Sequence, residues 1–443
     1  MPRWPWSGAV PTPGGSHSRG GPRHSSTRFA FLGALFHHPL DAMRTYILSA
    51  VVACVVARPV SPCRAATGAD GFDPALAADL SALCATHTFQ DLYGSDAAIL
   101  PAGYERLYVS EPRGLDNLFQ VFRKGGMGVI EIRGSTADPL SWMENMHAAM
   151  IPAEGSLTVD GKRFDYRFAD DTTAAVHAGY TLGISFIAPE VVEQIRALDG
   201  QGVDDIVITG HSQGGALALL LRAYLENLPA RRVPARVRFR TYAFANPMVG
   251  NTAFADIYRK AYCDDGTSFS IINPADPVPG MPLSFLDHPI FSSATLNGII
   301  GGQQGYDAKS LARSALLRMV RGGLSGVARY ASNSVDKRIS GPVGEVEMPP
   351  YRKELNYAVM PERIELEPFP YPLVLRDSTI LANDSLMRAY PRDAQGVFLD
   401  KDLYRKTPSF YHHKPYNYYV AVLRRWFPQR YEELRVKVLP ENL

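Results

Sequence analysis

The segment Gly210–Gly215 holds a serine between two glycines in the spacing G-x-S-x-G. A serine in this pattern, between a short strand and a helix, is typical of a nucleophile held on a sharp turn. Side chains at Gly210 and Gly214 would clash in such a turn, and the following helix directs its free N–H groups toward developing negative charge. The pattern predicts Ser212 as an acyl-transfer nucleophile, with the Gln213 backbone N–H as one oxyanion donor. The alternative is a glycine-rich turn with a structural serine.

The residues around this motif alternate between short apolar strands and helices. Strands are predicted at 129–132, 205–209, 237–244 and 269–273, and helices at 184–198, 216–228 and 253–261. Strands that alternate with helices favour a mostly parallel central sheet with helices on both faces. We therefore expect an α/β fold in which the serine lies where a strand enters a helix.

Five ordered blocks resemble the class 3 lipases, an α/β-hydrolase family that includes the fungal triacylglycerol lipases. The blocks are Ile130–Ser135, Val176–Tyr180, Gly210–Gly215, Tyr242–Asn251 and Asn273–Pro279. The similarity spans about residues 105–290 and resumes at 411–425. The resemblance implies an α/β-hydrolase fold over residues 70–443. The chain departs from the compact fungal members in one respect, because the gap between the catalytic acid and the histidine is much longer than they need; we expect an insertion there, at about 284–409.

A serine nucleophile needs an imidazole base, and the base needs an orienting carboxylate, in the chain order serine, acid, histidine. Only His288, His412 and His413 follow the serine. His288 lies 12 residues past the acid candidate Asp276, too close for a base on a separate loop. The family places its histidine shortly before an aromatic-rich helix, which favours His413 and leaves His412 as the alternative.

Asp276 matches the acid of the family, and the prolines on either side of it would restrain its loop. The alternative is a turn-forming aspartate beside proline, as occurs in many loops. Weaker candidates for the acid are Asp256, Asp264 and Asp265.

By the same resemblance, Ser135 supplies the second oxyanion donor through its backbone N–H and its hydroxyl. The alternative is a capping residue after a strand. Residues Trp142, Met143 and Met146 look like the short lid helix of these lipases. One helical face would carry four apolar residues, which are Leu140, Met143, Met146 and Met150. An ordinary helix packed on the core would show the same spacing.

The composition excludes several classes of protein. The 443 residues include 46 Lys+Arg and 44 Asp+Glu, a net charge of +2, and 46% are hydrophobic. These values exclude a largely disordered chain and a nucleic-acid binder with a broad basic surface. None of the four cysteines forms a CxxC pair, so we expect no zinc site built on cysteine. The predicted acyl-enzyme reaction is expected to use no metal and no cofactor. Cys84 and Cys263 either form one disulfide or are free and buried.

The N-terminal residues differ from the rest of the chain. Residues 1–42 are rich in Pro, Gly, Ser, Arg and His and are predicted to be a disordered basic extension ahead of the true start at Met43. Residues 43–65 combine a basic start, an apolar run and a small-residue end, as in a signal peptide. We therefore expect a secreted or cell-envelope protein. A single membrane anchor is the alternative, and a lipid-anchored Cys54 is a weaker one.

The sequence thus predicts a serine hydrolase of lipid esters, such as a triacylglycerol lipase. Phospholipase A1 and short-chain carboxylesterase activity are alternatives, and a non-catalytic lipid-binding or scaffold protein is an alternative of another class. The expected partners are lipid esters and, peripherally, lipid surfaces. The insertion is predicted to be a second cap, a contact with lipid headgroups, a docking surface for a protein, or a helical addition packed on the sheet.

Overall fold

The computed structural model describes residues 71–282, 339–353, 356–408 and 410–440. A seven-stranded sheet lies at its centre, in the order β1-β2-β3-β8-β9-β11-β14. Its strands are β1 (Glu105–Val109), β2 (Phe119–Lys124), β3 (Met127–Ile132), β8 (Asp205–His211), β9 (Arg238–Phe244), β11 (Ser268–Ile272) and β14 (Arg363–Glu365). The pairs from β3 to β14 are parallel, while β1 and β2 are antiparallel to their neighbours. The predicted α/β fold with a mostly parallel sheet is confirmed.

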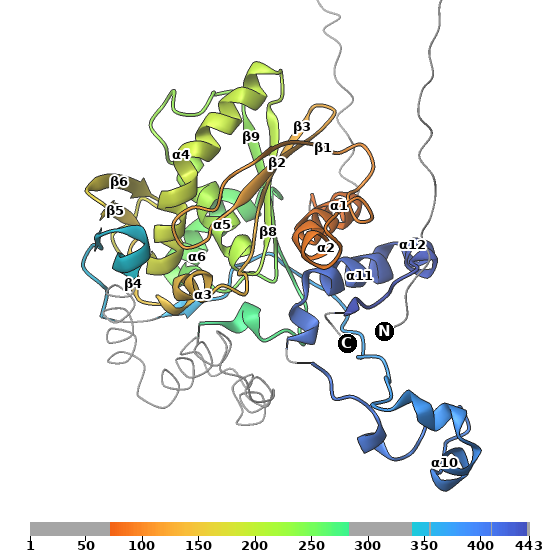
Figure 1. The fold of residues 1–443 in the computed structure, drawn as a ribbon. Helices are drawn as coiled ribbons and strands as arrows, with labels where there is room; N and C mark the ends of the chain where they lie inside the picture. Colours follow the sequence, from red (N-terminus) through yellow and green to blue (C-terminus); the bar gives the residue numbers. More distant parts are fainter. Residues whose placement is uncertain (1–70, 283–338, 354–355, 409, 441–443) are drawn as a thin grey trace, which may run out of the picture. The chain divides into compact units, whose positions relative to one another are not determined.

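Helices cover both faces of this sheet (Figure 1): α4 and α5 lie on one side, and α1 and α11 on the other. The helices of the described chain include α1 (Pro74–Cys84), α2 (Thr86–Tyr93), α4 (Ala178–Gly200), α5 (Gln213–Glu226), α6 (Thr252–Tyr258), α11 (Pro415–Trp426) and α12 (Pro428–Glu433). Alternate residues of β8 enter two hydrophobic clusters: Ile206 and Ile208 join one, and Val207 joins the other. Because successive strand side chains point to opposite faces, a strand buried on both sides has to be apolar throughout.

Two smaller sheets flank the main one, in the orders β13-β10-β7-β4 and β12-β5-β6. Their strands are β4 (Met150–Pro152), β5 (Glu154–Val159), β6 (Lys162–Arg167), β7 (Ala175–His177), β10 (Gly250–Asn251), β12 (Val346–Glu347) and β13 (Tyr357–Ala358). Strands β12, β13 and β14 all come from the insertion, and β14 extends the central sheet next to β11. This part of the insertion is therefore part of the sheet architecture and not a helical addition.

The later part of the insertion, about residues 373–405, contains a small hydrophobic cluster around Ile380, Phe398 and Tyr404. Short helices surround it: η4 (Ser378–Ala382), α10 (Asp384–Ala389) and η5 (Lys401–Leu403). Several expectations lie outside the described residues: the extension 1–42, the signal peptide 43–65, Cys54, and the first part of the insertion. Within the described residues, no helix is both long enough and apolar enough to cross a membrane.

Candidate active site

Ser212 occupies the turn between β8 and α5, in a strained backbone conformation with φ 60° and ψ −126°. This left-handed region is rare for residues other than glycine. The turn is so tight that a Cβ at Gly210 would lie 2.4 Å from the backbone of Gly214. A Cβ at Gly214 would lie 2.0 Å from the Ile132 carbonyl oxygen. The two glycines of the motif are therefore sterically required, and the half-buried Ser212 stands clear of the sheet.

The structure brings Ser212, His413 and Asp276 into one hydrogen-bonded series. His413 Nε2 lies 2.8 Å from Ser212 Oγ, and His413 Nδ1 lies 2.8 Å from Asp276 Oδ2. The Asp276 side chain is fully buried, while 15% of the His413 side chain is exposed. Ser212 follows β8, Asp276 follows β11, and His413 precedes α11, so well-packed elements position all three residues. The geometry is that of a nucleophile, a base and an orienting acid.

Asp276 is held by two further donors. The Tyr418 hydroxyl donates to Oδ2 at 2.7 Å, and the Val278 backbone N–H donates to Oδ1 at 3.0 Å. Tyr418 is itself fixed, because its oxygen accepts from the Asn273 N–H at 3.0 Å. Sequence reasoning missed Tyr418. The segment after His413 is rich in aromatic residues, but the sequence does not show which of its tyrosines contacts the carboxylate of Asp276.

The neighbouring histidines do not contact the serine. His412 is partly buried, its ring meets the edge of the Tyr411 ring at 5.1 Å, and burial lowers its pKa. His211 is buried, with its ring 4.8 Å from the His413 ring and 5.2 Å from that of Tyr418, and burial lowers its pKa well below the usual value. The described structure therefore joins His413, and not His412, to Ser212.

The two predicted oxyanion donors also lie together. Gln213 is the first residue of α5, where backbone N–H groups have no acceptor within the helix. Ser135 follows β3, and its hydroxyl donates to Gln213 Oε1 at 2.6 Å. Asn145 Nδ2 lies 2.8 Å from Ser135 Oγ and 2.9 Å from Gln213 Oε1. Sequence reasoning did not identify Asn145, because a polar residue on a short helix carries no signal of the side it faces.

The expected lid helix is α3 (Pro139–Met146). Leu140, Met143 and Met146 are partly buried against the larger hydrophobic cluster, and Trp142 Nε1 donates to the Thr136 carbonyl oxygen at 2.9 Å. The expectation that Met150 continues this helical face was wrong. The helix ends at Met146, and Met150 lies in β4, where it pairs with β7.

Cys84 and Cys263 are free and buried, so the disulfide alternative does not hold in the structure. Burial raises the pKa of the Cys263 thiol to about 12. Among the described residues, no group of three or more His, Cys, Asp or Glu side chains is arranged to hold a metal ion.

Comparison with known proteins gives the same family as the sequence blocks. Residues 129–286 match the family described as lipase (class 3). The chain is 30% identical over 163 residues to a secreted mono- and diacylglycerol lipase of Malassezia restricta, covering 36% of this chain and 49% of that protein. It is also 30% identical over 171 residues to a chloroplastic/mitochondrial phospholipase A1 of Oryza sativa subsp. indica, covering 36% of this chain and 37% of that protein.

The alignments thus span about half of the Malassezia protein and about a third of the rice protein. Among solved structures, the triacylglyceride lipase of Rhizomucor miehei is 18% identical with a TM-score of 0.36. That alignment covers 47% of this chain and 74% of the other.

Proposed function

We propose that this chain, whose residues 129–286 match the family described as lipase (class 3), hydrolyses carboxylic esters of lipids through an acyl-enzyme. The observation that carries the proposal is the series Ser212–His413–Asp276, with 2.8 Å at each of its two contacts. In this proposal Ser212 is the nucleophile, His413 is the general base and acid, and Asp276 orients and stabilises the imidazolium.

The reaction begins when Ser212 Oγ attacks the ester carbonyl carbon and its proton passes to His413 Nε2. The carbonyl oxygen becomes an oxyanion, which the Gln213 backbone N–H and Ser135 stabilise. The ester C–O bond then breaks as His413 donates its proton to the departing alkoxide, and an alcohol leaves. Water attacks the acyl-serine, gives a proton to His413 and releases the carboxylic acid. Ser212 finally recovers its proton.

The different exposure of the three side chains to solvent supports these roles. Asp276 is shielded from water, which strengthens its interaction with an imidazolium at Nδ1. Ser212 and His413 remain partly exposed, as groups that meet a substrate must be. The Tyr418 hydroxyl and the Val278 N–H restrain the carboxylate, so that its second oxygen and its rotation are both fixed.

The substrate class rests on the relatives, two of which are named as a mono- and diacylglycerol lipase and a phospholipase A1. We propose glycerides as the first substrates to test. Phospholipase A1 activity is the second candidate, because the rice relative matches with the same identity as the Malassezia one. Short-chain esters and a non-catalytic lipid-binding role are the remaining alternatives.

The test begins with a fluorophosphonate probe, which reacts with activated serines. We expect labelling of the protein and none of Ser212→Ala. A substrate panel of triolein, diolein, phosphatidylcholine and p-nitrophenyl butyrate then separates lipase, phospholipase A1 and esterase activity. A folded wild-type protein that is not labelled and hydrolyses none of these esters would leave the lipid-binding alternative.

We also propose that the protein is secreted. It is supported by the predicted signal peptide at 43–65 and by relatives from Malassezia, Fusarium and Penicillium whose names describe secreted lipases. N-terminal sequencing of the mature protein recovered outside the cytoplasm would test it. A chain that still begins at or before Met43 would contradict cleavage of this segment.

A further inference from the structure

Glu144 is a carboxyl group buried on the inner side of α3. None of it is exposed, and Oε2 accepts a hydrogen bond from Asn117 Nδ2 at 2.8 Å. Oε1 has no hydrogen-bond partner among the described residues and faces Gly183 of α4, where a Cβ would lie only 2.3 Å away. A buried glutamate without a cation is unusual, because desolvation disfavours the charged form. Here burial raises the pKa of Glu144 to about 8.

The side chain of Gln213 connects this carboxyl group with Ser135. Its Oε1 accepts from Ser135 Oγ at 2.6 Å and from Asn145 Nδ2 at 2.9 Å. The Gln213 side chain also lies near enough to Glu144 to interact with its carboxyl group. An amide whose oxygen faces two donors has its NH2 group left for an acceptor such as the carboxyl group. The Tyr180 hydroxyl donates to Asn145 Oδ1 at 2.9 Å, which in turn leaves the Asn145 NH2 group facing Gln213.

We propose that Glu144 and the side chain of Gln213 are positioning residues that set the direction of the Ser135 hydroxyl. The inference rests on the proposed ester hydrolysis, in which this hydroxyl donates to the oxyanion. In the structure the Ser135 proton is directed at Gln213 Oε1, so it has to turn toward the oxyanion during the reaction. Asn145 continues to donate to Gln213 Oε1 in that step, and no buried acceptor is left without a donor.

Glu144 has to be neutral for this arrangement to support catalysis. A carboxylate at this position would place a second negative charge close to the oxyanion in a buried site, where such repulsion is strong. The titratable groups on the packed helices offer no compensating charge. Burial raises the pKa of Tyr180 well above its usual value, lowers that of His147 to about 4, and lowers that of His177 well below its usual value.

The charged residues of the neighbouring segment are already paired. Asp116, next to Asn117, forms an ion pair with Arg133 at 2.8 Å and accepts from the Thr136 hydroxyl at 2.6 Å. Ionised Glu144 would therefore have only the Asn117 and Gln213 amides nearby to stabilise its charge. Both amides favour the ionised form of the carboxyl group, so its burial is what keeps Glu144 protonated.

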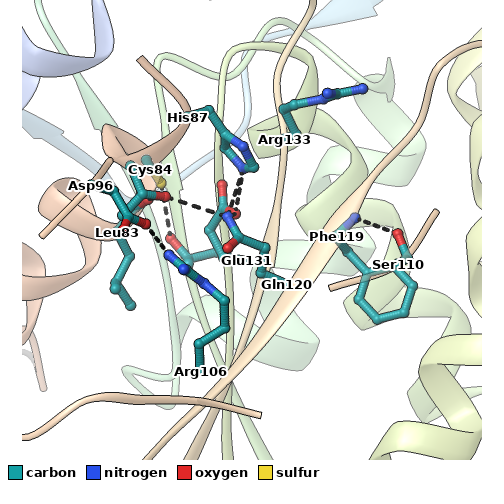
Figure 2. A network of polar contacts seen from close by, with 12 residues as sticks. Leu83, Cys84, His87, Asp96, Arg106, Ser110, Phe119, Gln120, Glu131 and Arg133 are labelled. Atoms are coloured by element: carbon teal, nitrogen blue, oxygen red, sulfur yellow. Dashed lines mark hydrogen bonds and ion pairs between the residues drawn. The ribbon is translucent and has the colours of Figure 1, made fainter. Parts of the chain in front are cut away.

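Glu131 provides a matched control within the same chain. It is also a buried glutamate, with 1% exposed, and its Oε2 contacts His87 Nε2 at 2.9 Å and Gln120 Nε2 at 3.2 Å (Figure 2). Glu131 lies in β3 and His87 in α2, and Figure 2 shows them beside Gln120. Glu131→Gln therefore replaces a buried carboxyl group by an amide without changing the partners of Ser135.

The experiment measures kcat and KM of the full chain on p-nitrophenyl butyrate from pH 6 to pH 10 for Gln213→Leu, Glu144→Ala, Glu144→Gln and Glu131→Gln. We expect Gln213→Leu and Glu144→Ala to lower kcat about tenfold with KM changed less than about twofold. Glu144→Gln should keep kcat within about twofold of wild type at pH 7. Above pH 8 the wild-type kcat should fall, while that of Glu144→Gln should not. Glu131→Gln should show the wild-type pH profile.

Unchanged kcat in Gln213→Leu and Glu144→Ala would overturn the inference, as would the same alkaline fall in wild type and Glu144→Gln. If Glu144→Ala does not fold, the pH profiles of Glu144→Gln and Glu131→Gln still test the inference. A wild-type protein that neither hydrolyses the ester nor reacts with the fluorophosphonate overturns the proposed function and this inference with it. An active wild type with unaltered variants overturns the inference alone.

Discussion

Replacing Glu144 by glutamine should make the free energy of unfolding less dependent on pH between about 5 and 8. In the folded protein burial raises the pKa of Glu144 from 4.5 to about 8. Between these values the unfolded chain releases the proton, while the folded chain retains it. The unfolded state is thereby favoured as the pH rises, so the contribution of this group to stability is complete below pH 4.5 and is lost by about pH 8.

The magnitude follows from the two pKa values. One pH unit corresponds to about 1.36 kcal/mol for a single proton, so a window of about 3.5 units corresponds to roughly 5 kcal/mol. This is an upper value, since water that reaches the carboxylate through local opening would reduce it. It is still large against a typical total stability of about 5–15 kcal/mol.

The assay is urea unfolding of wild type and Glu144→Gln at pH 5.5, 6.5, 7.5 and 8.5. All other titrations are common to the two proteins, so the difference between their curves isolates Glu144. We expect the variant to gain about 1 kcal/mol relative to wild type for each pH unit up to pH 8. Curves that run parallel over this range would show that Glu144 titrates normally and would refute the argument from burial.

Four further substitutions test the candidate site. Tyr418→Phe removes one of the two donors that hold the carboxyl group of Asp276 besides His413, and kcat on p-nitrophenyl butyrate should fall about tenfold at constant KM; a wild-type kcat would show that the hydroxyl only fills space. His413→Ala should reduce kcat by about a thousandfold or more, while His412→Ala should keep most of it, and the reverse order would assign the base to the neighbouring ring. Gly214→Ala places a Cβ 2.0 Å from a carbonyl oxygen of β3 and should lower stability by more than about 2 kcal/mol; an unchanged Tm would contradict the required close approach.

The extent to which the sequence predicts this structure depends on how local each signal is. The turn at Ser212 was predictable because its steric demand is met by glycines within two residues of the serine. The α/β sheet was predictable because β8 and its neighbours are apolar on both faces. By contrast, β14 joins β11 across about 90 residues, and three residues of ordinary composition carry no signal for such a distant pairing.

The polar network behind Ser135 could not be predicted for a related reason. Glu144 lies within a short helix rich in methionine, where a glutamate normally faces water. Its burial depends on the space left at Gly183, 39 positions later in the chain. The burial of Glu144 therefore depends on residues of both α3 and α4, and the sequence of neither helix shows it alone.

The two halves of the candidate site are supported differently, and this decides what a movement of α3 would affect. Ser212, Asp276 and His413 are held at the ends of β8 and β11 and before α11, in the packed centre of the domain. The Ser135 hydroxyl instead contacts Asn145 of α3 directly, and in our proposal it also depends on Glu144 of α3 through the Gln213 amide. A displacement of α3 would thus leave the proposed proton relay intact while it redirects the proposed oxyanion donor. Regulation by this helix would therefore change the stabilisation of the tetrahedral intermediate without changing the activation of the serine.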